Sequence, residues 1–130
     1  MTTTTPAREP LATTIVDQVL RSWQHHVDAH DPDAVAAVFT TDALFQGLRP
    51  THTIGRDGVR AYYASQPRGM TAAYDVLDVR ALSEASIAAF ARLTFNFVDG
   101  RTIAVHLTAL IERRRETWQI SHYHVSRIEA

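Results

Sequence analysis

Three features of the sequence predict an α+β fold. Apolar residues recur at every fourth position early in the chain, which is typical of an amphipathic helix. After Met70 the pattern changes to period-two and β-branched segments, which are typical of antiparallel strands. The chain has 130 residues, 45% of them apolar, as expected for a single globular domain. We therefore expect three N-terminal helices followed by a mainly antiparallel sheet.

The composition excludes several kinds of chemistry. The chain has 13 Lys+Arg and 14 Asp+Glu, a formal charge of −1, and every basic residue is Arg. Without Lys there is no Schiff base, and without Cys there is no thiolate nucleophile, disulfide or iron–sulfur cluster. The arginines are scattered apart from Arg113–Arg115, so no basic stripe is available for nucleic acid. We expect neither a cofactor nor a nucleic-acid partner.

The first ten residues, MTTTTPAREP, contain Thr and Pro but no apolar run. They predict a flexible tail over residues 1–10, without a signal peptide or a membrane-spanning segment. A single domain is then expected over residues 11–130, in a cytoplasmic protein with no membrane partner. The richness in Ala and Arg and the lack of Lys suggest a bacterial source.

The helices are predicted from apolar spacing and from capping residues. A first helix should run from Leu11 to about His30, because Ile15, Val19, Trp23 and Val27 recur at every fourth position. A second helix should follow the first, and a third helix should come later in the chain. A short strand over residues 43–48 should lie between the second and third helices. For the second helix, Asp31 is the expected N-cap, Pro32 the first helical position, and residues 34–39 supply the helix. The third helix should begin at Gly55–Gly58 and end at Pro67 and Gly69.

Four strands should follow, roughly over residues 73–82, 86–98, 102–113 and 117–128. The strands over residues 86–98 and 102–113 should form a hairpin with a three-residue loop that ends at Gly100 in the left-handed conformation. The two residue numbers of each cross-strand pair then add up to 198. That register gathers apolar residues on one face, and it places Arg92 opposite His106 on the other face. The apolar face contains Ile87, Ala89, Ala91, Leu93, Phe95, Ile103, Val105, Leu107, Ala109 and Ile111.

The last strand has two histidines at alternate positions, His122 and His124. Strict alternation puts them on one side together with Trp118, Ile120 and Ser126. An odd-length loop around residues 114–116 would align that side with the face that has Arg92 and His106. We expect this polar face to line a pocket, and we expect the apolar face to lie outside as a homodimer interface.

The chain resembles the nuclear transport factor 2-like superfamily over nearly its whole length from Leu11. The resembling segments are HDPDAVAAVFTTDALF, GRDGVRAYY, IAAFARLT and the ending W-x-x-x-H-x-H-x-S. Within the superfamily it is similar to SnoaL-like and SgcJ/EcaC-type proteins and to the association domain of calcium/calmodulin-dependent protein kinase. The resemblance implies a cone in which a curved sheet wraps around the first helix and leaves a pocket in its concave face. It also implies dimers that form through the outer face of the sheet.

The resemblance also implies a set of site residues. Arg92 matches the arginine of a pocket-lining R-x-T strand, Tyr62 a pocket tyrosine, and His122 and His124 a terminal pair. These four are the expected catalytic residues. The expected substrate-binding residues are Trp23, Phe90, Thr94, His106, Thr108 and Trp118. The remaining histidines, His25, His26 and His52, are expected to face solvent.

Three functions remain open. The first is a cofactor-independent enzyme of isomerase, dehydratase or cyclase type, acting by acid–base chemistry on a small hydrophobic natural-product-like or carbonyl substrate. The second is a non-catalytic ligand-binding or oligomerisation module that holds a small carboxylate through Arg92. The third is a metal site of His106, His122 and His124. Because Arg92 would repel a cation, we expect no metal. In the absence of a ligand, Arg92 should form an ion pair with a helix residue such as Asp28.

Overall fold

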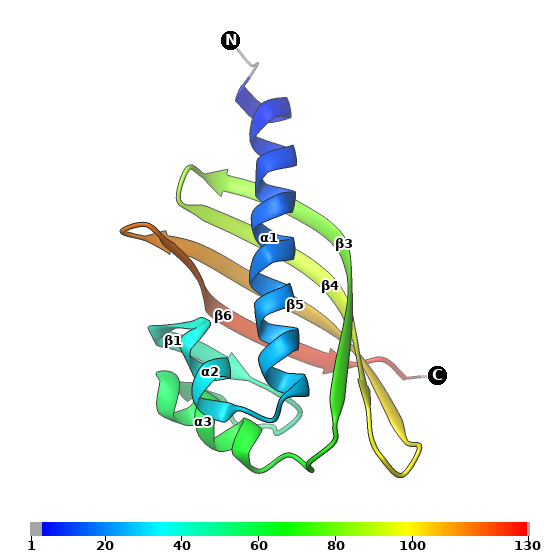
Figure 1. The fold of residues 1–130 in the computed structure, drawn as a ribbon. Coiled ribbons are helices and arrows are strands. Elements are labelled where there is room, and N and C mark those ends of the chain that lie inside the picture. The colour runs from blue at the N-terminus through cyan, green and yellow to red at the C-terminus, as the bar shows by residue number, and fades with distance from the viewer. Residues whose placement is uncertain (1–3, 130) are drawn as a thin grey trace.

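A six-stranded sheet curves around one long helix in the computed structural model, which describes residues 4–129 and their side chains from Pro10 onward (Figure 1). The strand order is β2-β1-β6-β5-β4-β3, and β1 and β6 form the parallel pair. The predicted α+β class, with a cone-like and mainly antiparallel sheet, is confirmed. The elements are α1 Thr4–Asp28, α2 Pro32–Ala37, β1 Phe39–Gln46, β2 Thr53–Ile54, α3 Arg56–Ala64, β3 Thr71–Ser83, β4 Ser86–Asn96, β5 Thr102–Arg114 and β6 Thr117–Arg127.

Helix α1 begins earlier than predicted. It starts at Thr4, within the segment for which a flexible tail is expected, and residues 1–3 lie outside the described part of the chain. Ala7, Arg8 and Glu9 favour a helix, and Pro6 lies in the first turn, where no amide hydrogen is needed. Pro10 removes one hydrogen bond from the helix without ending it. No helix of residues 4–129 is long and apolar enough to span a membrane.

The predicted cap of α2 is confirmed. The Asp31 carboxylate accepts a hydrogen bond of 3.1 Å from the Ala34 amide, and Pro32 is the first helical residue. This cap ends the turn between α1 and α2, and it sets α2 beside the C-terminal half of α1. Strand β1 follows directly from Phe39, four residues before the predicted start.

The predicted register of the central hairpin is also confirmed. Ile87 pairs with Ile111 and Arg92 with His106, and Gly100 has a φ of 93°. The predicted orientation of its two faces is wrong, however. The apolar face packs against α1 inside the cone and is not an outer dimer surface, because Leu93, Val105 and Leu107 are fully buried within one chain. The helix has an apolar stripe of its own, and the largest apolar surface of the sheet is its natural partner.

A β-bulge in β6 changes the predicted alternation of that strand. Ile120 pairs with Ile111 and His122 with Leu110, so Ser121 is an extra residue between them. Trp118 and Ile120 therefore lie on the opposite side from His122 and His124, contrary to the prediction of a shared side. Beyond the bulge, Tyr123 and Val125 are the buried residues of the strand.

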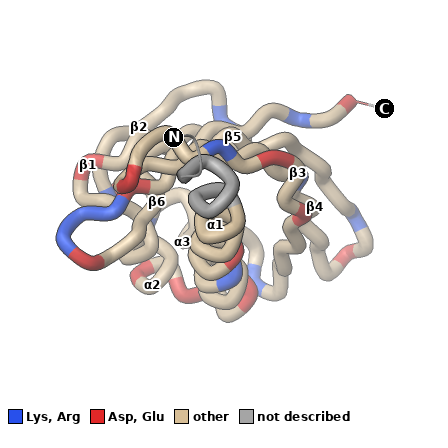
Figure 2. The backbone as a smooth tube through the Cα atoms, turned by 90° about the horizontal axis from the view of Figure 1, so that it is seen from above, with Lys and Arg blue, Asp and Glu red and all other residues tan. Residues whose placement is uncertain are grey.

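Charged residues of both signs are distributed over the whole backbone (Figure 2). The run Arg113–Arg115 lies at the turn between β5 and β6 and is exposed, as predicted. Arg114 in this run donates to Asp42 at 2.8 Å and to Glu112 at 3.0 Å. Figure 2 also shows the sheet curving around α1 when the helix is seen end-on.

Candidate functional site

A row of polar side chains on α1 faces a cleft. Gln18, Ser22 and His26 follow one another at four-residue intervals, so they lie on one side of the helix. They flank the apolar stripe that packs into the cone. Ser22 and His26 are half-buried, because α2 and β6 approach this side of α1. The α2-side cleft, as we call it, is therefore bounded along α1 by three groups that can form hydrogen bonds.

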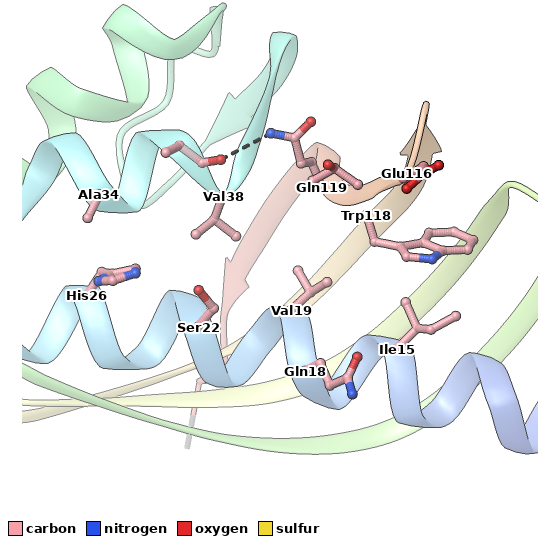
Figure 3. Close-up of a pocket in the computed structure, with 12 residues that line it drawn as sticks. Ile15, Gln18, Val19, Ser22, His26, Ala34, Val38, Glu116, Trp118 and Gln119 are labelled. Carbon is pink, nitrogen blue, oxygen red and sulfur yellow. Dashed lines mark hydrogen bonds between the residues drawn. The ribbon is translucent and has the colours of Figure 1, made fainter.

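The opposite wall of the α2-side cleft is mixed, because Glu116, Thr117 and Gln119 line it beside the apolar residues of α2 and Trp118 (Figure 3). Ala34, Ala37 and Val38 contribute small side chains from the α2 region, and Trp118 of β6 closes one end. The Gln119 amide donates to the Ala37 carbonyl at 3.1 Å and so holds β6 against the end of α2. The cleft has a volume of about 470 Å³ and is open to solvent. It combines apolar side chains with a small number of polar ones, which is the common composition of a small-molecule site.

A second cleft lies on the other side of Trp118. We call it the hairpin-side cleft, because it lies between the N-terminal half of α1 and the turns of the β3–β4 and β5–β6 hairpins. Its volume is about 600 Å³, and it shares Ile15, Gln18 and Trp118 with the α2-side cleft. The Arg113 guanidinium lies over the Trp118 ring at 5.7 Å from its centroid.

The interior of the cone beneath α1 is filled by aromatic side chains. Trp23 is fully buried and donates from Nε1 to the Tyr63 hydroxyl at 3.1 Å, and that hydroxyl lies 3.4 Å from the Tyr123 hydroxyl. Burial raises the pKa of Tyr63 and of Tyr123 well above that of a free tyrosine. Both phenols therefore stay protonated at neutral pH. Their hydroxyls are part of the hydrogen-bonded core around Trp23.

The predicted catalytic residues on the strands lie on the convex face of the sheet, away from α1. The prediction that they line a concave pocket is wrong, because α1 covers the other face. The Phe90 and His106 rings stack there at 5.1 Å between centroids. Arg92 is the register partner of Asp75 on β3, and among the described residues the expected ion pair with Asp28 is not formed. Asp28 accepts a hydrogen bond from the Ala72 amide at 2.8 Å. The residues displaced to this convex face are Phe90, Arg92, Thr94, His106, Thr108, His122 and His124.

The other predicted site residues have different positions. Trp23 lies in the core and lines neither cleft. Tyr62 is half-buried against Phe45, at 5.0 Å between ring centroids, and its hydroxyl accepts from the Leu48 amide at 3.1 Å. Burial raises its pKa. Tyr62 thus holds the loop after β1. Of the predicted residues, Trp118 lines both clefts.

The three-histidine metal site is not formed. His106 pairs with Ser126, His122 with Leu110 and His124 with Thr108, so the three side chains belong to different rows of the convex face. Among the described side chains, residues 10–129, there is no group of three His, Cys, Asp or Glu residues placed to hold a metal ion.

His26 was expected to face solvent; it is half-buried and lines the solvent-open α2-side cleft, a position that the sequence analysis did not predict. The sequence does contain a signal, since Gln18, Ser22 and His26 are three polar residues at four-residue spacing beside the apolar stripe. That pattern is also typical of an ordinary solvated helix face. The polar row lines a cleft because α2 and β6 pack close to this side of α1. The spacing of residues along α1 cannot indicate that packing.

The comparison with protein families decides the family. The SnoaL-like domain matches residues 16–129. The chain belongs to this family. The match falls within the domain predicted over residues 11–130, and the predicted resemblance to SnoaL-like and nuclear transport factor 2-like proteins is confirmed. A search of curated proteins gives no match.

Solved structures share the SnoaL-like fold at low sequence identity. A ketosteroid isomerase-like protein from Erwinia carotovora atroseptica is 19% identical with a TM-score of 0.76, over 90% of this chain and 96% of that one. A candidate calcium/calmodulin dependent protein kinase II association domain from Xanthomonas campestris is 17% identical with a TM-score of 0.75, over 87% and 85%. An NTF-2 like protein of unknown function from Shewanella oneidensis is 18% identical with a TM-score of 0.77, over 88% and 98%. At these identities the likeness shows the fold alone.

Proposed function

We propose that this SnoaL-like protein binds a small, mostly apolar molecule in the α2-side cleft. The row Gln18, Ser22 and His26 opposite the apolar side chains Ala34, Val38 and Trp118 supports this proposal. The helix rise places successive members of the row about 6 Å apart. A flat ligand with carbonyl or hydroxyl groups on one edge would meet these three side chains. Its other surface would contact Val38 and Trp118.

Acid–base catalysis is the second candidate, and His26 supports it. An imidazole is the usual proton carrier at neutral pH, and His26 is the histidine that lines this cleft. Gln18 and Ser22 would orient the carbonyl or hydroxyl group of the substrate. The reaction would be of isomerase, dehydratase or cyclase type and would need no cofactor. The fold is compatible with both candidates, since its relatives include a ketosteroid isomerase-like protein and an association-domain protein.

We retain two further expectations as part of the proposal. The protein would be a homodimer joined through the convex face of the sheet, where Phe90 is 39% exposed. It would act in the cytoplasm of a bacterium, in secondary metabolism.

The test begins with the ligand. Protein purified without a tag is denatured, and released small molecules are identified by mass spectrometry. The identified molecule is then offered to the parent, to His26→Gln and to His52→Gln. The last is the matched control because His52 is exposed and lines neither cleft. For a binding protein we expect His26→Gln to weaken affinity about tenfold, the loss of one buried hydrogen bond. For an enzyme we expect turnover to fall about a hundredfold.

Two results would contradict the proposal. One is a ligand whose affinity and turnover are the same in the parent and in His26→Gln. The other is unchanged binding in Ser22→Leu, which fills the middle of the α2-side cleft with a larger side chain.

A further inference from the structure

The hairpin-side cleft has an apolar floor and a charged rim. Ile15, Ile87 and Trp118 line it from α1, β4 and β6, and Leu11 of α1, 62% exposed, lies at its edge. The charged residues that line it are Arg113 and Glu84, from the ends of two different hairpins. The apolar part of a ligand would be covered in this cleft, while a polar group at one end of the ligand would lie near the charged rim.

The two neighbouring arginines of the β5–β6 hairpin differ in their partners. Arg114 is held by Asp42 and Glu112, and these hydrogen bonds raise its pKa. Arg113 forms no ion pair and no side-chain hydrogen bond with any residue of the described chain, including Glu84. Its guanidinium carbon lies over the Trp118 ring, 5.7 Å from the centroid, within range of a cation–π contact. The aromatic ring thus positions this cation, while its N–H donors stay free at the rim of the cleft.

We propose that the hairpin-side cleft binds a monocarboxylate with an apolar body. The carboxylate would accept hydrogen bonds from Arg113, and the body would lie against Trp118, Ile15 and Ile87. This site is separate from the α2-side cleft, although Trp118 is a wall of both. The proposal therefore does not depend on the function of His26.

Glu84 makes the site selective. Its carboxylate lines the same rim and repels a second negative charge on the ligand. A monocarboxylate that reaches Arg113 binds in spite of this repulsion, whereas a dicarboxylate with its second group toward Glu84 is excluded. Neutralising Glu84 should consequently strengthen binding of a monocarboxylate.

The experiment uses 1-naphthoate as the probe and the neutral 1-naphthylmethanol as its matched ligand. Binding is followed by titration calorimetry and by tryptophan fluorescence, to which Trp118 responds because Trp23 is buried away from both clefts. We expect Arg113→Gln to weaken 1-naphthoate binding about fivefold, a modest factor because this guanidinium is exposed. We expect Glu84→Gln to strengthen it about threefold. The neutral ligand should bind equally to the parent and to both variants.

The control is Arg115→Gln, which removes the same charge from the tip of the same hairpin but does not line the cleft. The proposal is overturned if 1-naphthoate fails to bind, if Arg113→Gln and Arg115→Gln weaken it equally, or if the two ligands respond alike to Arg113→Gln. His26→Gln separates the two clefts. Unchanged 1-naphthoate affinity in that variant supports the assignment to the hairpin-side cleft, and a loss contradicts it.

Discussion

His30 adopts a left-handed backbone conformation at the end of α1, with a φ of 51°. Its amide donates to the Val27 carbonyl, and the Asp31 amide donates to the His26 carbonyl at 3.1 Å. These two bonds form the Schellman arrangement, in which glycine is the preferred residue at the left-handed position. A histidine there has a steric cost that glycine lacks.

We therefore predict that His30→Gly raises the free energy of unfolding by about 0.5–1 kcal/mol. Urea denaturation followed by circular dichroism measures the change. Ala29→Gly is the control, because Ala29 has an ordinary negative φ, and it should lower stability by about 1 kcal/mol. Equal losses in both variants would contradict the role given to the left-handed conformation.

At the scale of elements, α2 is a short helix whose position depends on its cap. Asp31 satisfies the Ala34 amide, and α2 supplies apolar side chains to the α2-side cleft. We predict that Asp31→Ala lowers the free energy of unfolding by about 1 kcal/mol and that Asp31→Asn, which keeps a side-chain acceptor, lowers it by much less. Thermal denaturation compares the two variants. Similar losses would mean that the carboxylate charge, and not the cap, matters.

At the scale of the whole molecule, no helix of residues 4–129 covers the convex face of the sheet. Phe90 stacks on His106 there and is partly exposed. We predict a homodimer through this face and its dissociation in Phe90→Glu, because an unpaired carboxylate would be buried in the interface. Light scattering gives the mass. Val98→Glu, an exposed change at a hairpin turn, is the control and should leave the dimer intact. A parent protein that is monomeric at micromolar concentration would refute the prediction.

Short-range features of this chain could be predicted from the sequence. The cap at Asp31, the order of helices and strands, and the register that pairs Arg92 with His106 depend on neighbouring residues or on one turn. Each is decided by local hydrogen bonds or by the matching of apolar positions across a hairpin. The bulge at Ser121 is the local exception, because no turn or glycine marks it.

The tertiary structure alone decided which face of the sheet α1 covers. An apolar face needs a partner, but periodicity does not say whether that partner is the chain's own helix or a second molecule. Because α1 covers the apolar face, Arg92, His122 and His124 lie on the outer, convex face of the sheet. It also made the candidate clefts from α1, α2 and β6, segments that are distant in sequence and meet only when the sheet curves around the helix. Local spacing therefore indicates the helices and the central hairpin. The parallel β1–β6 pair and the site are set by long-range packing, since hydrophobic burial is non-directional.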